Sequence, residues 1–183
     1  MTIQINNELR DRAYQCACEH GFHNKEYSDE YCLMLIITEI SEAVDADRKG
    51  KHANKEYIEE ELTNLESKGY FIRGFDYLIK GSVEEELADI VIRCLDYAGL
   101  NKINIDDRII LSYTVSKKKS FIENMYAIVK DIVNYKYSKE ELINYALRQV
   151  LRVAEFYNID LLYHIEQKMK YNELRPMLNG KKY

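Results

Sequence analysis

A chain of 183 residues can form one domain with a substantial apolar core, and its 46% hydrophobic and 31% charged content is typical of a soluble globular protein. One proline and seven glycines leave long uninterrupted segments, which favours helices. The formal net charge of −5 argues against a general nucleic-acid binder. Because neither a leader nor a long apolar run is evident, we expect a cytoplasmic protein that does not enter a membrane.

The first two helices are predicted before residue 51. The first covers residues 5–20 and ends at Gly21, since a glycine commonly follows the last turn of a helix. The second covers residues 31–50, and either Ser28 or Asp29 is placed to cap its first turn.

The second predicted helix carries an acidic pair in an apolar setting. Its core face follows the spacing of one helical side: Leu33, Ile36, Ile37, Ile40 and Val44. On the same helical wheel the neighbours of Glu39 are mostly apolar, and Glu42 follows one turn later. A carboxylate among apolar neighbours is unfavourable unless a cation or hydrogen bonds compensate it, so this pair is a candidate site.

Residues 51–81 form a separate, less regular stretch. Residues 57–66 are helical in character but very acidic, and three glycines punctuate residues 67–81. Several apolar side chains here need burial, so we expect a helical arm or a lid: Phe71, Ile72, Phe75, Tyr77, Leu78 and Ile79. The alternative is a surface excursion without a catalytic part.

The helix predicted over residues 83–98 has a broad apolar face and a narrow polar stripe. Ser82 is a fair N-cap, with Glu85 three positions on to complete a capping box. The stripe repeats at helical spacing: Glu86, Asp89, Arg93 and Asp96. One interpretation is a solvated stripe with an Asp89–Arg93 ion pair, and the helix dipole also favours glutamates in the first turn.

A second interpretation joins the two acidic pairs. If the two helices pack side by side, Glu39, Glu42, Glu86 and Asp89 converge. Four such groups cannot all stay ionised without a counter-charge, because like charges raise one another's pKa. Mg²⁺ prefers carboxylate oxygens and substrate phosphates, so the pattern predicts a divalent-cation site, in which Mn²⁺ could replace Mg²⁺.

The C-terminal half adds helices and a basic end. Residues 104–113 are ambiguous, whereas 121–135 and 138–157 are amphipathic helices, the latter with a Ser138–Glu141 capping box. Five cations follow in a short space, against Glu173: Lys168, Lys170, Arg175, Lys181 and Lys182. Beside a metal site such a cluster suits a polyanionic substrate, and the alternative is a solvated terminus. Tyr171 could stack on a base, although packing is its default role.

Three stretches, in the same order, resemble MazG-type all-α nucleoside triphosphate pyrophosphohydrolases: EISEAVDADRKG, EEELADIVIRCLDYAG and KMKYNELRPMLNGKKY. The resemblance implies an all-α helical bundle of the MazG-like type, a single domain over residues 1–183 with an insertion at about 51–81. Two features depart from the family. The gap between Glu42 and Glu86 is long, and Asn179 stands where related chains often have histidine.

The resemblance also implies an activity, the Mg²⁺-dependent hydrolysis of nucleoside triphosphates between the α and β phosphates. The metal-holding and catalytic residues would be Glu39, Glu42, Glu86 and Asp89. Substrate contacts would come from Lys168, Arg175 and Lys181 to the leaving pyrophosphate and from Asn172 to the sugar or base. Related enzymes form dimers or dimers of dimers, so a homo-oligomer is expected.

The sequence leaves two alternatives open. The chain could be a non-catalytic helical module whose amphipathic faces bind a protein partner. It could also keep the chemistry and change the substrate, as in dUTP-type or phosphoribosyl-nucleotide hydrolysis by related all-α folds.

Overall fold

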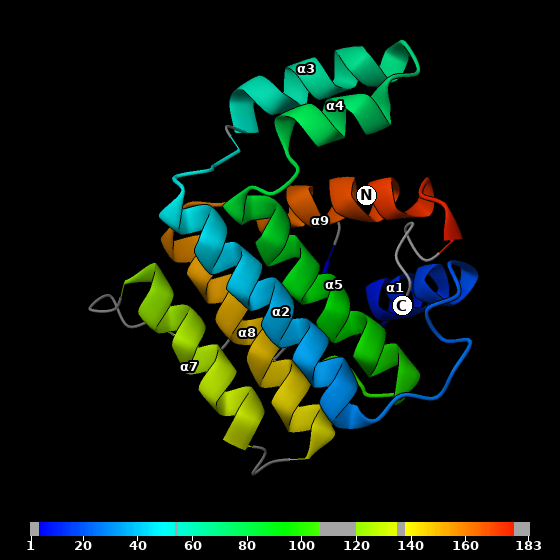
Figure 1. Cartoon of the computed structure of the whole chain (residues 1–183), viewed down its shortest axis with the longest axis vertical. Helices are drawn as coiled ribbons and strands as arrows, with labels where there is room; N and C mark the ends of the chain where they lie inside the picture. Colours follow the sequence, from blue (N-terminus) through cyan, green and yellow to red (C-terminus); the bar gives the residue numbers. More distant parts are fainter. Residues whose placement is uncertain (1–3, 54, 107–119, 135–137, 178–183) are drawn as a thin grey trace.

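A computed structural model describes residues 4–53, 55–106, 120–134 and 138–177, which form eight helices and no strand (Figure 1). The helices are α1 (Asn7–Glu19), α2 (Asp29–Arg48), α3 (Lys55–Ser67), α4 (Phe71–Leu78), α5 (Val83–Leu100), α7 (Phe121–Asn134), α8 (Lys139–Phe156) and α9 (Leu161–Glu173). The predicted all-α class is therefore confirmed for the described residues, while the MazG-type bundle stays a prediction. The ambiguous segment 104–113 is described only as far as residue 106.

Helix α5 lies at the centre of the bundle and packs against α1, α2, α8 and α9. Its predicted apolar face is buried: Val83, Leu87, Ile90, Val91, Cys94, Leu95 and Ala98. Ile92 and Tyr97 are buried as well, so only a narrow polar strip of α5 is left partly accessible. This strip faces the side on which α2 and α9 flank the helix (Figure 1).

The starts of α2 and α8 and the end of α1 follow the predicted capping chemistry. The Ser28 hydroxyl accepts a hydrogen bond from the Tyr31 N–H at 3.2 Å, which begins α2. Both halves of the Ser138–Glu141 capping box are formed at the start of α8. Gly21 has a φ of +81°, a left-handed conformation that glycine adopts without strain and that lets the chain leave α1.

The segment predicted as an insertion contains a hairpin of α3 and α4 that stands outside the bundle (Figure 1). It has a small core of its own, to which α9 contributes one buried side chain, Tyr171, and the partly buried Tyr163. The buried members of this core are Ala53, Ile58, Leu62, Phe71, Phe75, Ile79 and Tyr171. Gly74 permits the close approach of the two helices, since a Cβ there would lie 2.9 Å from Leu65 Cδ1. The expected burial of Ile72 and Tyr77 is wrong, because a two-helix hairpin has only one inner face and both side chains are exposed.

Both ends of the hairpin are tied to the first turn of α5. On the incoming side, the Ala53 N–H donates to Glu84 at 2.8 Å, and the Val83 N–H donates to the Lys51 carbonyl at 3.0 Å. On the outgoing side, the Gly81 N–H donates to the carboxylate of Glu85. The hairpin is thus anchored beside the N-terminus of α5, close to the acidic residues of that helix.

None of the helices in the described ranges has the combination of length and apolar character that crossing a bilayer requires.

Candidate functional site

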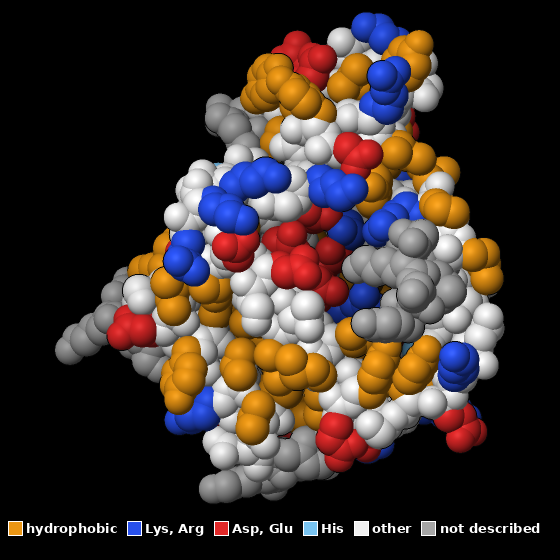
Figure 2. All heavy atoms as spheres, viewed as in Figure 1, with side chains coloured by type: hydrophobic (Ala, Val, Ile, Leu, Met, Phe, Trp, Pro, Cys, Tyr) orange, Lys and Arg blue, Asp and Glu red, His pale blue; other side chains and the backbone are white. Residues whose placement is uncertain are grey.

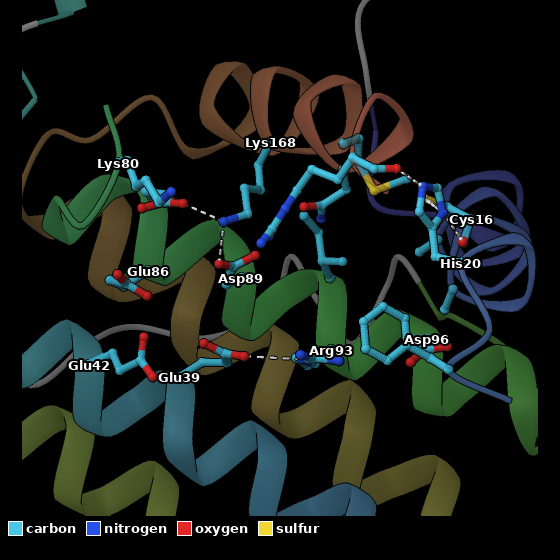
Figure 3. Close-up of a pocket in the computed structure, with 18 of the residues that line it drawn as sticks. Cys16, His20, Glu39, Glu42, Lys80, Glu86, Asp89, Arg93, Asp96 and Lys168 are labelled. Carbon is cyan, nitrogen blue, oxygen red and sulfur yellow. Dashed lines mark hydrogen bonds and ion pairs between the residues drawn. The ribbon is translucent and has the colours of Figure 1, made fainter. Parts of the chain in front are cut away.

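Helices α2 and α5 pack side by side and bring the two predicted acidic pairs together (Figure 3). Glu39, Glu42 and Glu86 each offer one carboxylate oxygen, and these three oxygens lie within 4.8 Å of one another. Glu39 and Glu86 are buried, whereas Glu42 is exposed. Asp89 lies one turn further along α5 and lines the same cavity. The cluster therefore sits at the edge of the bundle, buried on one side and accessible on the other.

The cluster has too little positive charge around its most buried member. Burial, and then the neighbouring carboxylates of Glu85, Asp89 and Glu42, raise the pKa of Glu86 to about 8. Burial and the charge of Asp89 also raise the pKa of Glu39, although Arg93 opposes this. A site in which several carboxyl groups resist ionisation will take up either protons or a cation.

The ion pairs beside the cluster differ from the predicted one. Arg93 does not pair with Asp89; its Nε lies 3.1 Å from the Glu39 carboxylate on α2. Asp89 pairs instead with Lys168 of α9, at 2.6 Å. The interpretation of a solvated Asp89–Arg93 pair is therefore wrong, because α2 and α9 supply closer partners for both residues.

Glu85 belongs to the site, a role that the sequence did not indicate. The predicted capping box is only half formed: the Ser82 hydroxyl accepts from the Glu85 N–H at 3.2 Å. The Glu85 carboxylate instead accepts from the Gly81 N–H and pairs with Lys168. No local pattern could have revealed this, because Lys168 is 83 residues away in the chain.

A cavity of about 300 Å³ opens over these residues. Six carboxylates line it: Glu39, Glu42, Glu85, Glu86, Asp89 and Asp96. Four cationic side chains line it as well: Lys80, Arg93, Lys168 and Arg175. Figure 2 shows acidic side chains gathered at the middle of this face, with Lys and Arg side chains next to them. A cavity with this mixture suits a metal ion together with an anionic ligand.

The residues predicted to contact substrate differ in their burial and in whether they line the cavity. Lys168 is only 6% exposed and is held by two carboxylates. Asn172 and Arg175 line the cavity, and the Asn172 Oδ1 is buried with no hydrogen-bond partner among the described residues. Lys181 lies outside the described residues. The Tyr171 ring stacks on Phe75 with ring centroids 4.2 Å apart, so packing, and not base stacking, is its role here.

A second cavity of about 160 Å³ adjoins the first and shares Glu39, Glu42, Arg93, Asp96 and Phe22 with it. Half of the residues in the rest of its lining are aromatic, namely His23, Tyr27, Tyr31 and Tyr97, and the others are Cys32, Leu35, Thr38 and Leu100. This pocket was not predicted from the sequence, although the aromatic residues between α1 and α2 were a usable signal. His23 is fixed there by its Nε2, which lies 2.6 Å from the Asp96 carboxylate.

Comparisons of the chain with protein-family models, with curated proteins and with solved structures find no match. The resemblance to MazG-type enzymes therefore stays a prediction, and the case for a function depends on the geometry of the site.

Proposed function

We propose that this chain is a divalent-cation-dependent nucleoside triphosphate pyrophosphohydrolase, which releases a nucleoside monophosphate and pyrophosphate. The observation that carries the proposal is the meeting of three carboxylate oxygens within 4.8 Å, inside a cavity that cationic side chains also line. Carboxylate clusters of this kind suit Mg²⁺, which commonly binds carboxylates and substrate phosphates together.

The donor set fits such an ion chemically. Glu39, Glu42, Glu86 and Asp89 would hold it, and a bound cation would relieve the mutual repulsion that raises the pKa of Glu86. When bound, the ion would supply charge neutralisation and Lewis acidity at the phosphate. Mg²⁺ is the expected ion, and Mn²⁺ is the expected substitute.

The two cavities suit the two ends of a nucleotide. The aromatic pocket around Phe22, Tyr27 and Tyr31 offers apolar ring faces to a base. The larger cavity carries the carboxylates and the cationic side chains, which suit the phosphates. This arrangement would place the bond between the α and β phosphates over the carboxylate cluster.

Among the clustered carboxylates, Glu42 is the best placed to accept the proton of the attacking water, because it is the solvent-exposed member. In the proposed reaction the water oxygen bonds to the α phosphorus and the bond to the bridging oxygen breaks. Pyrophosphate then leaves with that oxygen, and the proton of the water passes to the carboxylate. Cationic side chains in the cavity would stabilise the charge on the leaving group.

The test is a pyrophosphate-release screen over all ribo- and deoxyribonucleoside triphosphates, with dUTP and a phosphoribosyl nucleotide included to detect the related activities. We expect release with Mg²⁺, none with a chelator, and none in Glu39→Gln or Asp89→Asn variants that keep their helical circular-dichroism signal. If no nucleotide is hydrolysed, the proposal is wrong. If one variant is fully active, that residue has no part in the site.

One observation favours the alternative of a non-catalytic interaction module. An apolar groove of about 340 Å³ lies between α2 and α7, and Met34 and Val133 in its lining are exposed. The two functions differ in their need for metal. A module has no use for a cation in the carboxylate cluster, whereas the enzyme requires one.

A further inference from the structure

The cationic side chains that line the larger cavity are not equally available to a ligand. Lys168 is buried between the carboxylates of Glu85 and Asp89, and Arg93 is engaged by Glu39. Withdrawing Lys168 would leave the buried carboxylate of Glu85 and the partly buried carboxylate of Asp89 without their cation, which is strongly unfavourable. Among the described residues of the lining, an incoming phosphate therefore finds the half-exposed Lys80 more readily than Lys168 or Arg93.

Lys80 comes from the insertion and lies just beyond the end of α4. Its side chain is 50% exposed, and its Nζ is held by Asp76 of α4 at 2.9 Å and by the Tyr171 hydroxyl of α9 at 3.2 Å. An exposed ion pair such as Lys80–Asp76 contributes little free energy. The Lys80 ammonium can therefore turn partly to a phosphate at little cost in stability. Asp76 also raises the pKa of Lys80, which keeps the ammonium charged.

The position of Lys80 relative to the carboxylates sets a direction across the site. Figure 3 shows Lys80 on the left of the view, above Glu86, and Asp96 on the opposite side of the site, to the right of Arg93. The aromatic pocket lies at the Asp96 end. A ligand with an aromatic group in that pocket and its scissile phosphate over the carboxylates would therefore extend its remaining phosphates toward Lys80.

We propose that Lys80 binds the terminal phosphates of the substrate, and hence the pyrophosphate product, and that the hairpin serves to place it there. This assignment rests on the proposed function and adds a residue that lies outside the three stretches of family resemblance. Arg175, whose guanidinium lies 5.3 Å from the centre of the Tyr171 ring, lines the same cavity.

The experiment is calorimetric titration of the full chain with pyrophosphate in Mg²⁺, using the wild type, Lys80→Ala, Lys80→Arg and Lys68→Ala. Lys68 is the matched control, an exposed lysine at the far turn of the same hairpin that does not line the cavity. We expect Lys80→Ala to weaken binding about tenfold, the loss of one charge-assisted hydrogen bond, and Lys80→Arg to retain most of the affinity. Lys68→Ala should bind as the wild type does.

Unchanged affinity in Lys80→Ala would overturn the assignment, and so would an equal loss in Lys68→Ala or a wild type that does not bind pyrophosphate. Thermal melting of each variant checks that it is folded. Turnover separates this inference from the proposed function. If pyrophosphate binds through Lys80 but no nucleotide is hydrolysed, the Lys80 subsite is supported and the proposed enzymatic function is wrong. If a nucleotide is hydrolysed and Lys80→Ala has the KM of the wild type, the enzymatic function is supported and the Lys80 subsite is wrong.

Discussion

The proposed chemistry needs Glu86 to be ionised, whereas the stability of the metal-free bundle is lowered by ionising it. It is 7% exposed and lies beside three other carboxylates, which together with burial raise its pKa to about 8. Ionising such a group in the folded chain is unfavourable unless a cation is present. A residue that lowers stability in this way is more typical of a functional site than of a core.

We predict that Glu86→Gln stabilises the metal-free protein at pH 8 by on the order of 1 kcal/mol, because a neutral amide avoids the buried charge. The same change should abolish nucleotide turnover. Urea unfolding in the presence of a chelator measures the free energy of unfolding. Glu26→Gln, at an exposed loop position, is the control and should change neither quantity. A Glu86→Gln protein less stable than the wild type would contradict the interpretation.

The raised pKa of Glu86 also fixes the sign of a pH dependence. Between its ordinary value near 4.5 and its folded value of about 8, the native state binds a proton that the unfolded state has lost. The free energy of unfolding of the metal-free protein should therefore fall as the pH rises from about 5 to 8, and Glu39 and Glu85 act in the same direction. Asp29 and Asp76, whose pKa values are lowered, act only in more acidic solution.

Thermal melts at several pH values, with a chelator and with Mg²⁺, check this dependence. Because protons and the cation compete for the same carboxylates, the stabilisation by Mg²⁺ should grow with pH. If the melting temperature in the chelator stays constant or rises with pH, the carboxyl groups ionise normally. The electrostatic argument for a cation site would then be wrong.

At the scale of one element, α9 carries two lysines in very different settings. Lys168 is buried between Glu85 and Asp89, while Lys170 makes a partly exposed pair with Glu66. We predict that Lys168→Ala costs about 3–5 kcal/mol of unfolding free energy, because the buried Glu85 and the partly buried Asp89 lose their cation. Lys170→Ala should cost less than about 1 kcal/mol. Equal losses in urea unfolding would show that Lys168 is not the buried counter-ion described here.

The hairpin of α3 and α4 is a second element with its own energetics. Its core is separate from that of the bundle, and Phe75 is stacked on Tyr171 of α9. We predict that Phe75→Ala, a loss of about 3 kcal/mol of local packing, speeds amide hydrogen exchange in α3 and α4 and leaves α2 and α5 protected. Tyr77→Ala, at an 85% exposed position of the same helix, is the control. Equal deprotection of the bundle would show that the two cores unfold together.

The elements also show how far sequence reasoning reaches. Apolar spacing predicted α2 and α5, and the apolar setting of Glu39 indicated its burial beside a second acidic pair. The partners of Arg93 and Glu85 were not predicted correctly, and the packing role given to Tyr171 by default did not include its partner Phe75. Helical periodicity tells which face a residue occupies, but the partners come from elements distant in the chain: α2 for Arg93, α9 for Glu85 and the hairpin for Tyr171.

For the whole molecule, the arrangement of helices makes the site by placing two anionic helices together at one surface. Helix α5 is enclosed by α1, α2, α8 and α9, and α9 covers it from the side where the carboxylates lie. The sequence predicted helices flanking the acidic pairs, but not that the insertion would dock on α9 and reach the cavity through Lys80. The expected homo-oligomer stays a prediction, which sedimentation of the full chain would check.

The central claim is that α2 and α5 together hold a divalent cation, and thermal melting with and without Mg²⁺ at pH 8 tests it most directly. An ion that binds only the folded state must raise the melting temperature, by roughly 5–10 °C at a hundredfold excess over its Kd for a chain of this size. Glu42→Gln, which changes an exposed member of the cluster, should reduce that rise sharply and remain folded. An unchanged melting temperature in both Mg²⁺ and Mn²⁺, or an equal rise in the variant, would contradict the account.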